Sequence, residues 1–147
     1  MRIMGLDVGD KTIGVAVSDE LGITANPVTV IQRTASLKKD IGEVRRIAEA
    51  GGVERIVVGM PLMLDGTMGI QAEKVAGFVE ALRRRVRIPV DVWDERLTTV
   101  EVERVLVEMD QSRAKRRKVI DKLAAAVILK SYLDRQSAKA GEADDAR

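Results

Sequence analysis

Three acidic residues, far apart in the sequence, occur inside or at the end of apolar segments. Asp7 lies near the end of the run IMGLDV, and Glu95 directly follows the run VDVWD. Asp121 lies in KVIDKLAAAVIL, an otherwise apolar segment with helical spacing. An unpaired buried carboxylate is costly, so Asp121 in particular needs a cation as its partner.

The residue types that the chain lacks narrow the chemistry of these acids. The sequence contains no His and no Cys, which excludes an imidazole base, a thiolate nucleophile, disulfides and metal sites built on either residue. Carboxylates without imidazole favour a hard, oxygen-binding ion such as Mg²⁺ or Mn²⁺. Two such ions about 4 Å apart could activate water and stabilise the leaving oxygen of a phosphodiester.

The first two acids also have purely structural interpretations. Asp7 could accept hydrogen bonds from the amides of Gly9 and Lys11 in the turn that follows it. Glu95 could form an ion pair with Arg96 or with a nearby lysine. Only convergence of the acids at one place would favour metal binding over these interpretations.

The third acid has a similar alternative. Asp121 could pair with Arg117 or Lys118, about one helical turn earlier. Two further acids, Asp91 and Asp94, are more typical of solvent-exposed charges at the edge of a strand than of ligands.

The elements that must position these residues follow from the spacing of apolar side chains. Alternating or continuous apolar runs predict strands at about residues 2–8, 12–18, 26–32, 53–58 and 90–94. Helical spacing predicts helices at about 37–50 and 70–85, a helix that begins at a capping box of Thr98 and Glu101, and a last helix over about 114–135. Residues 1–135 are expected to form one domain, and the polar residues 136–147 a flexible tail.

This order of elements predicts an α/β fold with a mixed five-stranded sheet, strand order 3-2-1-4-5, and helices on both faces. The first, fourth and fifth strands are then parallel. Sites in such sheets form beyond the carboxyl ends of the parallel strands, where Asp7 and Glu95 both lie. Their backbones would be about 10 Å apart, and Gly59, at the end of the strand between them, leaves room for their side chains.

Charge and hydropathy indicate a globular protein with basic clusters that would suit a polyanion. The 147 residues carry a net charge of only +2, with 33% charged and 46% hydrophobic residues. No uncharged stretch is long enough to cross a membrane and no signal peptide is evident, so a cytoplasmic location is expected. Cations cluster in 83–87, where they could simply offset a helix dipole, and in 112–118. The second cluster supplies candidate nucleic-acid contacts, namely Arg113, Lys115 and Arg116.

Four segments carry a resemblance to a known family. GLDVGDKTIGVAVSD, IVVGMPLMLDG, DERLTTVEVERVL and IDKLAAAVILKSYL are similar, in this order, to the signature segments of the YqgF family. These are small bacterial proteins with a ribonuclease H-like fold, related to Holliday junction resolvases of the RuvC type. The resemblance covers about residues 2–134.

The resemblance implies a metal-dependent nuclease that matures the 5′ end of pre-16S ribosomal RNA. It implies that Asp7, Glu95 and Asp121 form the acidic, metal-binding and catalytic triad, and that Lys11 and Arg96 face the phosphates. The bound ions would be Mg²⁺ or Mn²⁺, in a two-metal site.

The chain also departs from the related patterns. RuvC-type enzymes have a carboxylate near the end of the fourth strand, where this chain has Gly59, so Glu95 must substitute from the neighbouring strand. Family members often have Asn at the position of Met63 and a basic residue at the position of Thr12.

Other functions remain compatible with the sequence. A Holliday junction resolvase makes two coordinated cuts and needs a two-fold dimer, whereas the sequence allows a monomer or a homodimer. A non-catalytic, ribosome-associated RNA-binding module would keep the fold without the chemistry. The segment DVGDKTIGVAV also resembles the phosphate hairpin of actin-like ATPases and sugar kinases, but these close two domains around ATP, and 147 residues provide no second domain.

Overall fold

The computed structural model describes residues 1–97 and 113–145, and within the last helix it describes the side chains of residues 123–139. The described elements, in chain order, are β1 (Ile3–Val8), β2 (Thr12–Ser18), β3 (Ala25–Gln32), α1 (Leu37–Ala50), β4 (Arg55–Met60), α2 (Ile70–Arg85), β5 (Val90–Asp94), the 3₁₀ turn η1 (Glu95–Leu97) and α4 (Arg113–Asp145). The helix predicted to begin at Thr98 lies outside the described residues.

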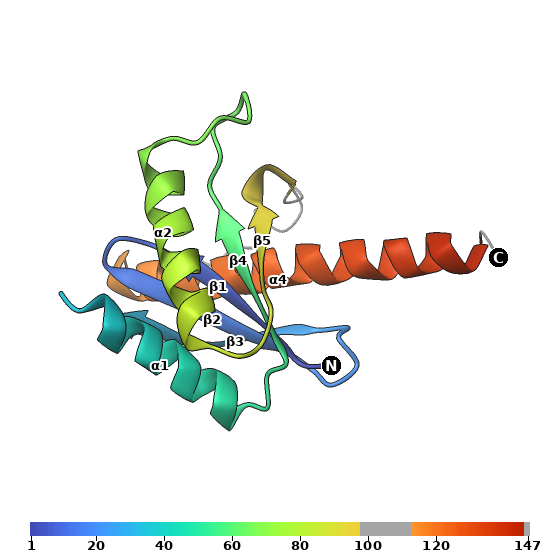
Figure 1. Ribbon diagram of the computed structural model, residues 1–147, viewed down its shortest axis with the longest axis horizontal. Helices are drawn as coiled ribbons and strands as arrows, with labels where there is room; N and C mark the ends of the chain where they lie inside the picture. The colour runs from blue at the N-terminus through green and yellow to red at the C-terminus, as the bar shows by residue number, and fades with distance from the viewer. Residues whose placement is uncertain (98–112, 146–147) are drawn as a thin grey trace.

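The strands form one mixed sheet in the order β3-β2-β1-β4-β5, which confirms the predicted topology. β1 pairs antiparallel with β2, and β2 antiparallel with β3. β4 is parallel to both β1 and β5. The carboxyl ends of the three parallel strands therefore meet at one edge of the sheet (Figure 1).

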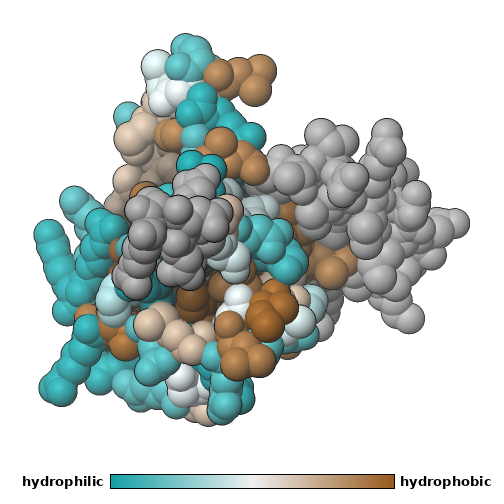
Figure 2. Space-filling view, turned by 90° about the vertical axis from the view of Figure 1, so that its right-hand side faces the viewer, coloured by the Kyte–Doolittle hydropathy of each residue, from teal (hydrophilic) through white to brown (hydrophobic). Residues whose placement is uncertain are grey.

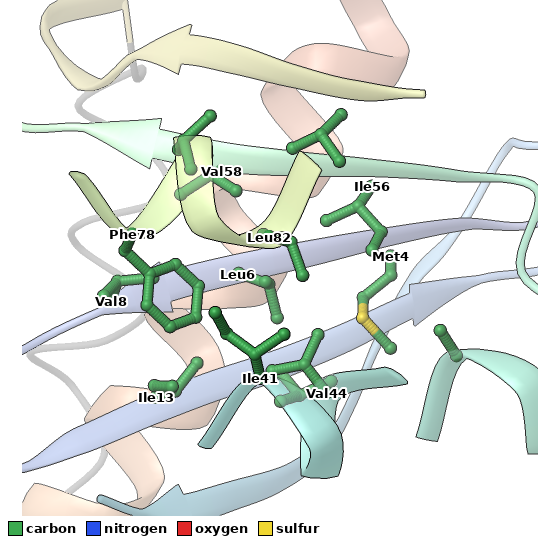
Figure 3. Packing of buried hydrophobic residues seen from close by; sticks show 14 of the residues in the cluster. Met4, Leu6, Val8, Ile13, Ile41, Val44, Ile56, Val58, Phe78 and Leu82 are labelled. Atoms are coloured by element: carbon green, nitrogen blue, oxygen red, sulfur yellow. The ribbon is translucent and has the colours of Figure 1, made fainter. Parts of the chain in front are cut away.

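Helices cover both faces of the sheet, as predicted. α1 and α2 lie in front of the sheet in Figure 1, and α4 passes behind it. On the α1–α2 face, Met4, Leu6 and Val8 of β1 point toward Ile41 of α1 and Phe78 of α2 (Figure 3). Because side chains alternate along a strand, the odd-numbered residues of β1 face α4 instead.

The contact between α4 and the sheet is unusually close. A Cβ built on Gly5 of β1 would lie 2.7 Å from the Cβ of Leu129 and 2.9 Å from the carbonyl oxygen of Ala125. Any side chain at position 5 would push the helix away. The cluster on this face includes Ala16, Val57, Trp93, Ile128 and Tyr132.

Two boundaries differ from the sequence-based expectation. β4 covers 55–60 rather than 53–58, because the Val53 amide donates to the Ala48 carbonyl (3.0 Å) and Gly52 adopts a φ of +63°, which together close the end of α1. α4 continues to Asp145 rather than ending near Arg135, since the sequence there is rich in Ala, the strongest helix former. The division into a domain 1–135 and a flexible tail stays a prediction.

Among the described residues, no helix has the length and apolar character needed to cross a membrane.

Candidate active site

Asp7 lies at the carboxyl end of β1, half-buried and opposite Gly14 of β2. The strand alternation that turns Ile3 and Gly5 toward α4 places Asp7 on the same face. The amide of Gly9 donates to the carbonyl oxygen of Thr12 (2.9 Å), so a backbone bond closes the turn. The Gly9 amide thus has a backbone partner, while the interpretation of Asp7 as a cap for the Gly9 and Lys11 amides stays a prediction.

Glu95 directly follows β5 and begins η1. Its Oε1 lies 2.8 Å from the point where a Cβ on Gly59 would be, and the Cδ1 of Ile128 lies 2.5 Å from the same point. The carboxylate thus occupies the space left by the missing side chain of β4. This confirms the expectation that Gly59 leaves room for an acid from a neighbouring strand.

The environment of Glu95 disfavours its negative charge. Burial, together with the charges of Asp7 and Asp94, raises the pKa of Glu95 from 4.5 to about 7. Within the described part of the chain, no Lys or Arg forms an ion pair with this carboxylate. The charge of Asp7 contributes to the raised pKa of Glu95, which places the carboxylate at the end of β1 near the one that follows β5, as the sequence predicts.

Arg96 does not pair with Glu95 but with the acid on its other side. Its guanidinium donates to both carboxylate oxygens of Asp94, from Nε at 3.1 and 3.0 Å and from Nη2 at 2.7 Å. The hydrogen bonds from Arg96 lower the pKa of Asp94. Nη1 of Arg96 reaches the carbonyl oxygen of Leu64 (3.3 Å). The Arg96 side chain stays about one-third exposed.

The sequence suggested that Asp91 and Asp94 are solvent-exposed charges, but each of them has a partner in the structure. Asp91 accepts hydrogen bonds from Arg55 and from the hydroxyl of Tyr132 (2.8 Å), at the opposite end of β5 from the acids. Each of the two acids is half-buried and is held by an arginine.

Lys11 is exposed in the turn between β1 and β2, where its carbonyl oxygen accepts from the amide of Arg33 (2.8 Å). The same arginine donates from Nη1 to the carbonyl oxygen of Gly9 (2.8 Å) and pairs through Nε with Asp40 (3.3 Å). Asp40 is 2% exposed and also accepts from the amide and hydroxyl of Thr34. This brace supports the turn that follows Asp7.

The Arg33–Asp40 pair was not identified from the sequence. Burial alone would raise the pKa of Asp40, but the hydrogen bonds from Thr34 and Arg33 outweigh it and lower the pKa. A signal was available, because Asp40 precedes Ile41 on the buried side of an amphipathic helix.

The remaining predicted site residues lie in the first part of α4. The backbone places Arg113, Lys115, Arg116 and Asp121 on this helix, and their side chains lie outside the described residues. The triad role of Asp121 and its alternative pairing with Arg117 or Lys118 both stay predictions.

The direction of α4 nevertheless shows which of its residues lie beside which part of β1. Leu133 contacts Gly22 near the amino end of β1, and Ala125 contacts Gly5 in its middle. The helix therefore runs antiparallel to β1, and position 121 comes one turn beyond Ala125 on the same stripe, in the direction of Asp7.

The donor set at this edge fits a divalent cation. Asp7 and Glu95 supply oxygen atoms only, and the pKa of Glu95 is raised first by burial and then by the charges of Asp7 and Asp94, both of which a bound cation would offset. The open space over Gly59 accommodates the carboxylate of Glu95. The described side chains, which do not include that of Asp121, contain no group of three metal-ligating residues.

Known proteins resemble this chain over nearly its whole length. The model of the RuvX family, described as Holliday junction resolvase, matches residues 1–135. A protein of Symbiobacterium thermophilum is 56% identical over 142 residues, which cover 97% of this chain and 98% of the relative. One of Desulforamulus reducens is 55% identical over 134 residues, which cover 91% and 97%. Both carry the name "Putative pre-16S rRNA nuclease".

A solved structure shares the architecture. RuvC of Thermus thermophilus, in complex with a Holliday junction substrate, matches with a TM-score of 0.55 and 16% identity, over 89% of this chain and 91% of that chain. At this identity the likeness concerns the fold alone. It confirms the expected ribonuclease H-like architecture.

Proposed function

The chain belongs to the RuvX family, also called YqgF, and from this membership we propose that it is a metal-dependent endonuclease that processes the 5′ end of pre-16S ribosomal RNA. One observation carries the chemical part of the proposal. The carboxylate of Glu95 lies over Gly59 under the influence of Asp7, with its pKa raised to about 7. The proposed substrate implies a cytoplasmic location.

The choice of RNA rests on the relatives. Proteins at 55% and 56% identity, matched over more than nine-tenths of this chain and of their own length, carry the name of a nuclease of this precursor. The basic residues support a polyanionic substrate, since Lys11 and Arg96 lie exposed near the acids.

Each residue has a defined part in the proposed reaction. Asp7, Glu95 and Asp121 would hold Mg²⁺ or Mn²⁺, and two such ions supply an activated water and stabilise the leaving oxygen of a phosphodiester. Glu95, with a pKa of about 7, has to release its proton to act as a ligand. Lys11 and Arg96 would attract the phosphates next to the scissile bond, and the cluster at the start of α4 the more distant backbone, through Arg113, Lys115 and Arg116.

A second candidate function has specific support. The family model is described as Holliday junction resolvase, so four-way DNA is the alternative substrate. Junction resolution needs two coordinated cuts and hence a two-fold dimer.

Cleavage assays separate these functions. The wild type is incubated with a pre-16S RNA fragment or a four-way DNA junction, with Mg²⁺ or Mn²⁺, beside the variants Asp7→Asn, Glu95→Gln and Asp121→Asn. We expect RNA cleavage by the wild type and its loss in all three variants. Asp10→Asn is the matched control, because Asp10 is an exposed acid of the same turn that pairs with Lys74. Equal cleavage by wild type and Asp7→Asn would contradict the proposed site, and cleavage of the junction alone by a dimeric protein would favour the resolvase.

A further inference from the structure

The chain between β4 and α2 exposes apolar side chains at the edge of the sheet that carries the acids. We call residues 61–69 the β4–α2 loop. Leu64 at its tip is 96% exposed, and Met63 and Met68 are about half exposed. Ile70, at the start of α2, is 76% exposed. Figure 1 shows the loop rising beyond the ends of the strands, and Figure 2 shows apolar residues protruding at this end of the molecule. The proposed catalytic residues make no use of these side chains.

The loop contains several internal hydrogen bonds. The Met63 amide donates to the Thr67 carbonyl (2.9 Å), and the Gly66 amide donates to the Met63 carbonyl (2.8 Å). Oδ1 of Asp65 accepts from the amide and hydroxyl of Thr67, at 3.0 and 2.6 Å. Gly66 has a φ of +87°, which favours glycine. The exposed leucine is therefore presented on a structured turn.

The same loop is joined to the candidate active site through Arg96. The guanidinium of Arg96 donates to the carbonyl oxygen of Leu64 (3.3 Å) and lies 3.3 Å from the point where a Cβ on Gly66 would be. Asp94 holds that guanidinium from the other side. Since Arg96 follows Glu95 in the chain, the position of Leu64 is coupled to that of a proposed metal ligand.

The size and place of this patch favour a nucleic acid over another protein. It is one narrow turn, whereas a standard protein interface takes roughly 20–30 residues from each partner. It stands beside the arginine proposed to face phosphates. Exposed Leu, Ile and Met side chains next to backbone contacts are the wedges by which proteins unstack neighbouring bases.

We propose that Leu64 is an unstacking wedge that enters the end of an RNA helix next to the scissile phosphate. The proposal rests on the proposed nuclease function and deepens it by naming the substrate class, which is RNA at the boundary between a double helix and a single strand. At such a boundary the terminal bases are stacked on one side only, so opening them is least costly. Arg96 then fixes the distance between the wedge and the cut.

Base unstacking is measured with an RNA hairpin that carries a single-stranded 5′ extension and 2-aminopurine in its terminal base pair. The protein is added in EDTA, so that unstacking is observed without cleavage. We expect the wild type to raise the 2-aminopurine fluorescence and Leu64→Ser to bind without raising it. Leu64→Phe should raise the 2-aminopurine fluorescence as the wild type does. This result would show that a large apolar side chain at position 64 unstacks the bases. Leu21→Ser is the matched control, because Leu21 is 79% exposed in the turn between β2 and β3, away from the acids.

Cleavage provides the second readout, with Mg²⁺ or Mn²⁺ present. Leu64→Ser should cut the hairpin about tenfold more slowly, since unstacking a base step is worth about that factor or more. It should cut an unstructured strand of the same local sequence as fast as the wild type. Equal fluorescence and equal hairpin cleavage for wild type and Leu64→Ser would overturn the wedge. So would a change in oligomeric state caused by Leu64→Ser, because it would make the patch a contact between copies. A wild type that cuts neither RNA contradicts the nuclease function, while the fluorescence in EDTA still decides the wedge.

Discussion

The carboxylate of Glu95 lies directly over the backbone of Gly59, with Oε1 2.8 Å from the point where a Cβ on that glycine would be. An acid that directly follows β5 thus occupies the place that a side chain of β4 would fill. Ile128 of α4 closes the same space from the other side, since its Cδ1 lies 2.5 Å from that point. A glycine in the central parallel strand is therefore a condition for the position of the acid.

Gly59→Ala should displace Glu95 and abolish activity. The added methyl group meets Ile128 and the Glu95 carboxylate at once, and such overpacking costs about 1–3 kcal/mol of stability. Urea unfolding measures that cost, and the RNA cleavage assay measures the loss of activity. Gly42→Ala in α1 is the control, because a Cβ there meets nothing within 4 Å, and it should leave cleavage unchanged. A fully active Gly59→Ala protein would show that the carboxylate does not depend on this space.

The stability of the metal-free protein should depend on the ionisation of Glu95. The folded protein keeps the proton up to about pH 7, whereas the unfolded chain loses it near pH 4.5, so stability falls as the pH rises between these values. At about pH 8, Glu95→Gln should be more stable than the wild type by about 1–2 kcal/mol, a value that allows for solvent screening of the half-buried group. At about pH 4 the two proteins should be equally stable. Urea titrations in EDTA test this, with Glu54→Gln, at an exposed site outside the acid cluster, as the control. A constant difference at every pH would contradict it.

Divalent ions should stabilise the fold through the same acids. Binding to the folded state alone contributes about 2.7 kcal/mol when the free ion exceeds its Kd a hundredfold. Mn²⁺ should raise the melting temperature of the wild type and of Asp10→Asn but not that of Asp7→Asn. Differential scanning fluorimetry with increasing Mn²⁺ measures the shift without any substrate. The same shift in Asp7→Asn and wild type would place the ion elsewhere.

Asp40→Asn should weaken the support of the turn after β1. Removing one partner of the buried Arg33–Asp40 pair is expected to cost about 2 kcal/mol, since Arg33 retains some contact with solvent. Because the pKa of Asp40 is lowered, its contribution is present above the ordinary pKa of 3.8 and is lost as the pH falls through the lower folded value. Chemical unfolding at neutral pH provides the measurement.

Glu43→Gln is the matched control for this variant. It breaks the exposed Glu43–Arg46 pair of the same helix and should leave the unfolding midpoint nearly unchanged. Equal effects of the two substitutions would show that Asp40 is no more than a surface charge.

The topology could be predicted because alternation and helical spacing are local signals that agree with one another. Runs such as TIGVAVS identify their strands directly, and the order of strands and helices then leaves few arrangements. The place of Asp7 and Glu95 at one edge followed from that topology. β4 begins two residues later than predicted, because the closure of α1 by Gly52 and Val53 depends on backbone geometry rather than on hydrophobic pattern.

Charge partners were the least predictable part of the site. Arg96 is adjacent to Glu95 in the chain but bonds Asp94, since the 3₁₀ turn directs consecutive side chains to different sides. The partnership of Arg55 with Asp91 joins two strands and cannot be identified from spacing along one of them. The contribution of Asp121 stays a prediction, supported by the antiparallel course of α4 along β1.

Arg96 reaches the β4–α2 loop through the carbonyl oxygen of Leu64 and not through its side chain. Every amino acid carries that carbonyl, so substitutions at the tip can accumulate among relatives without loosening the connection. Preference for one RNA or another can then drift during evolution while the scissile position stays constant.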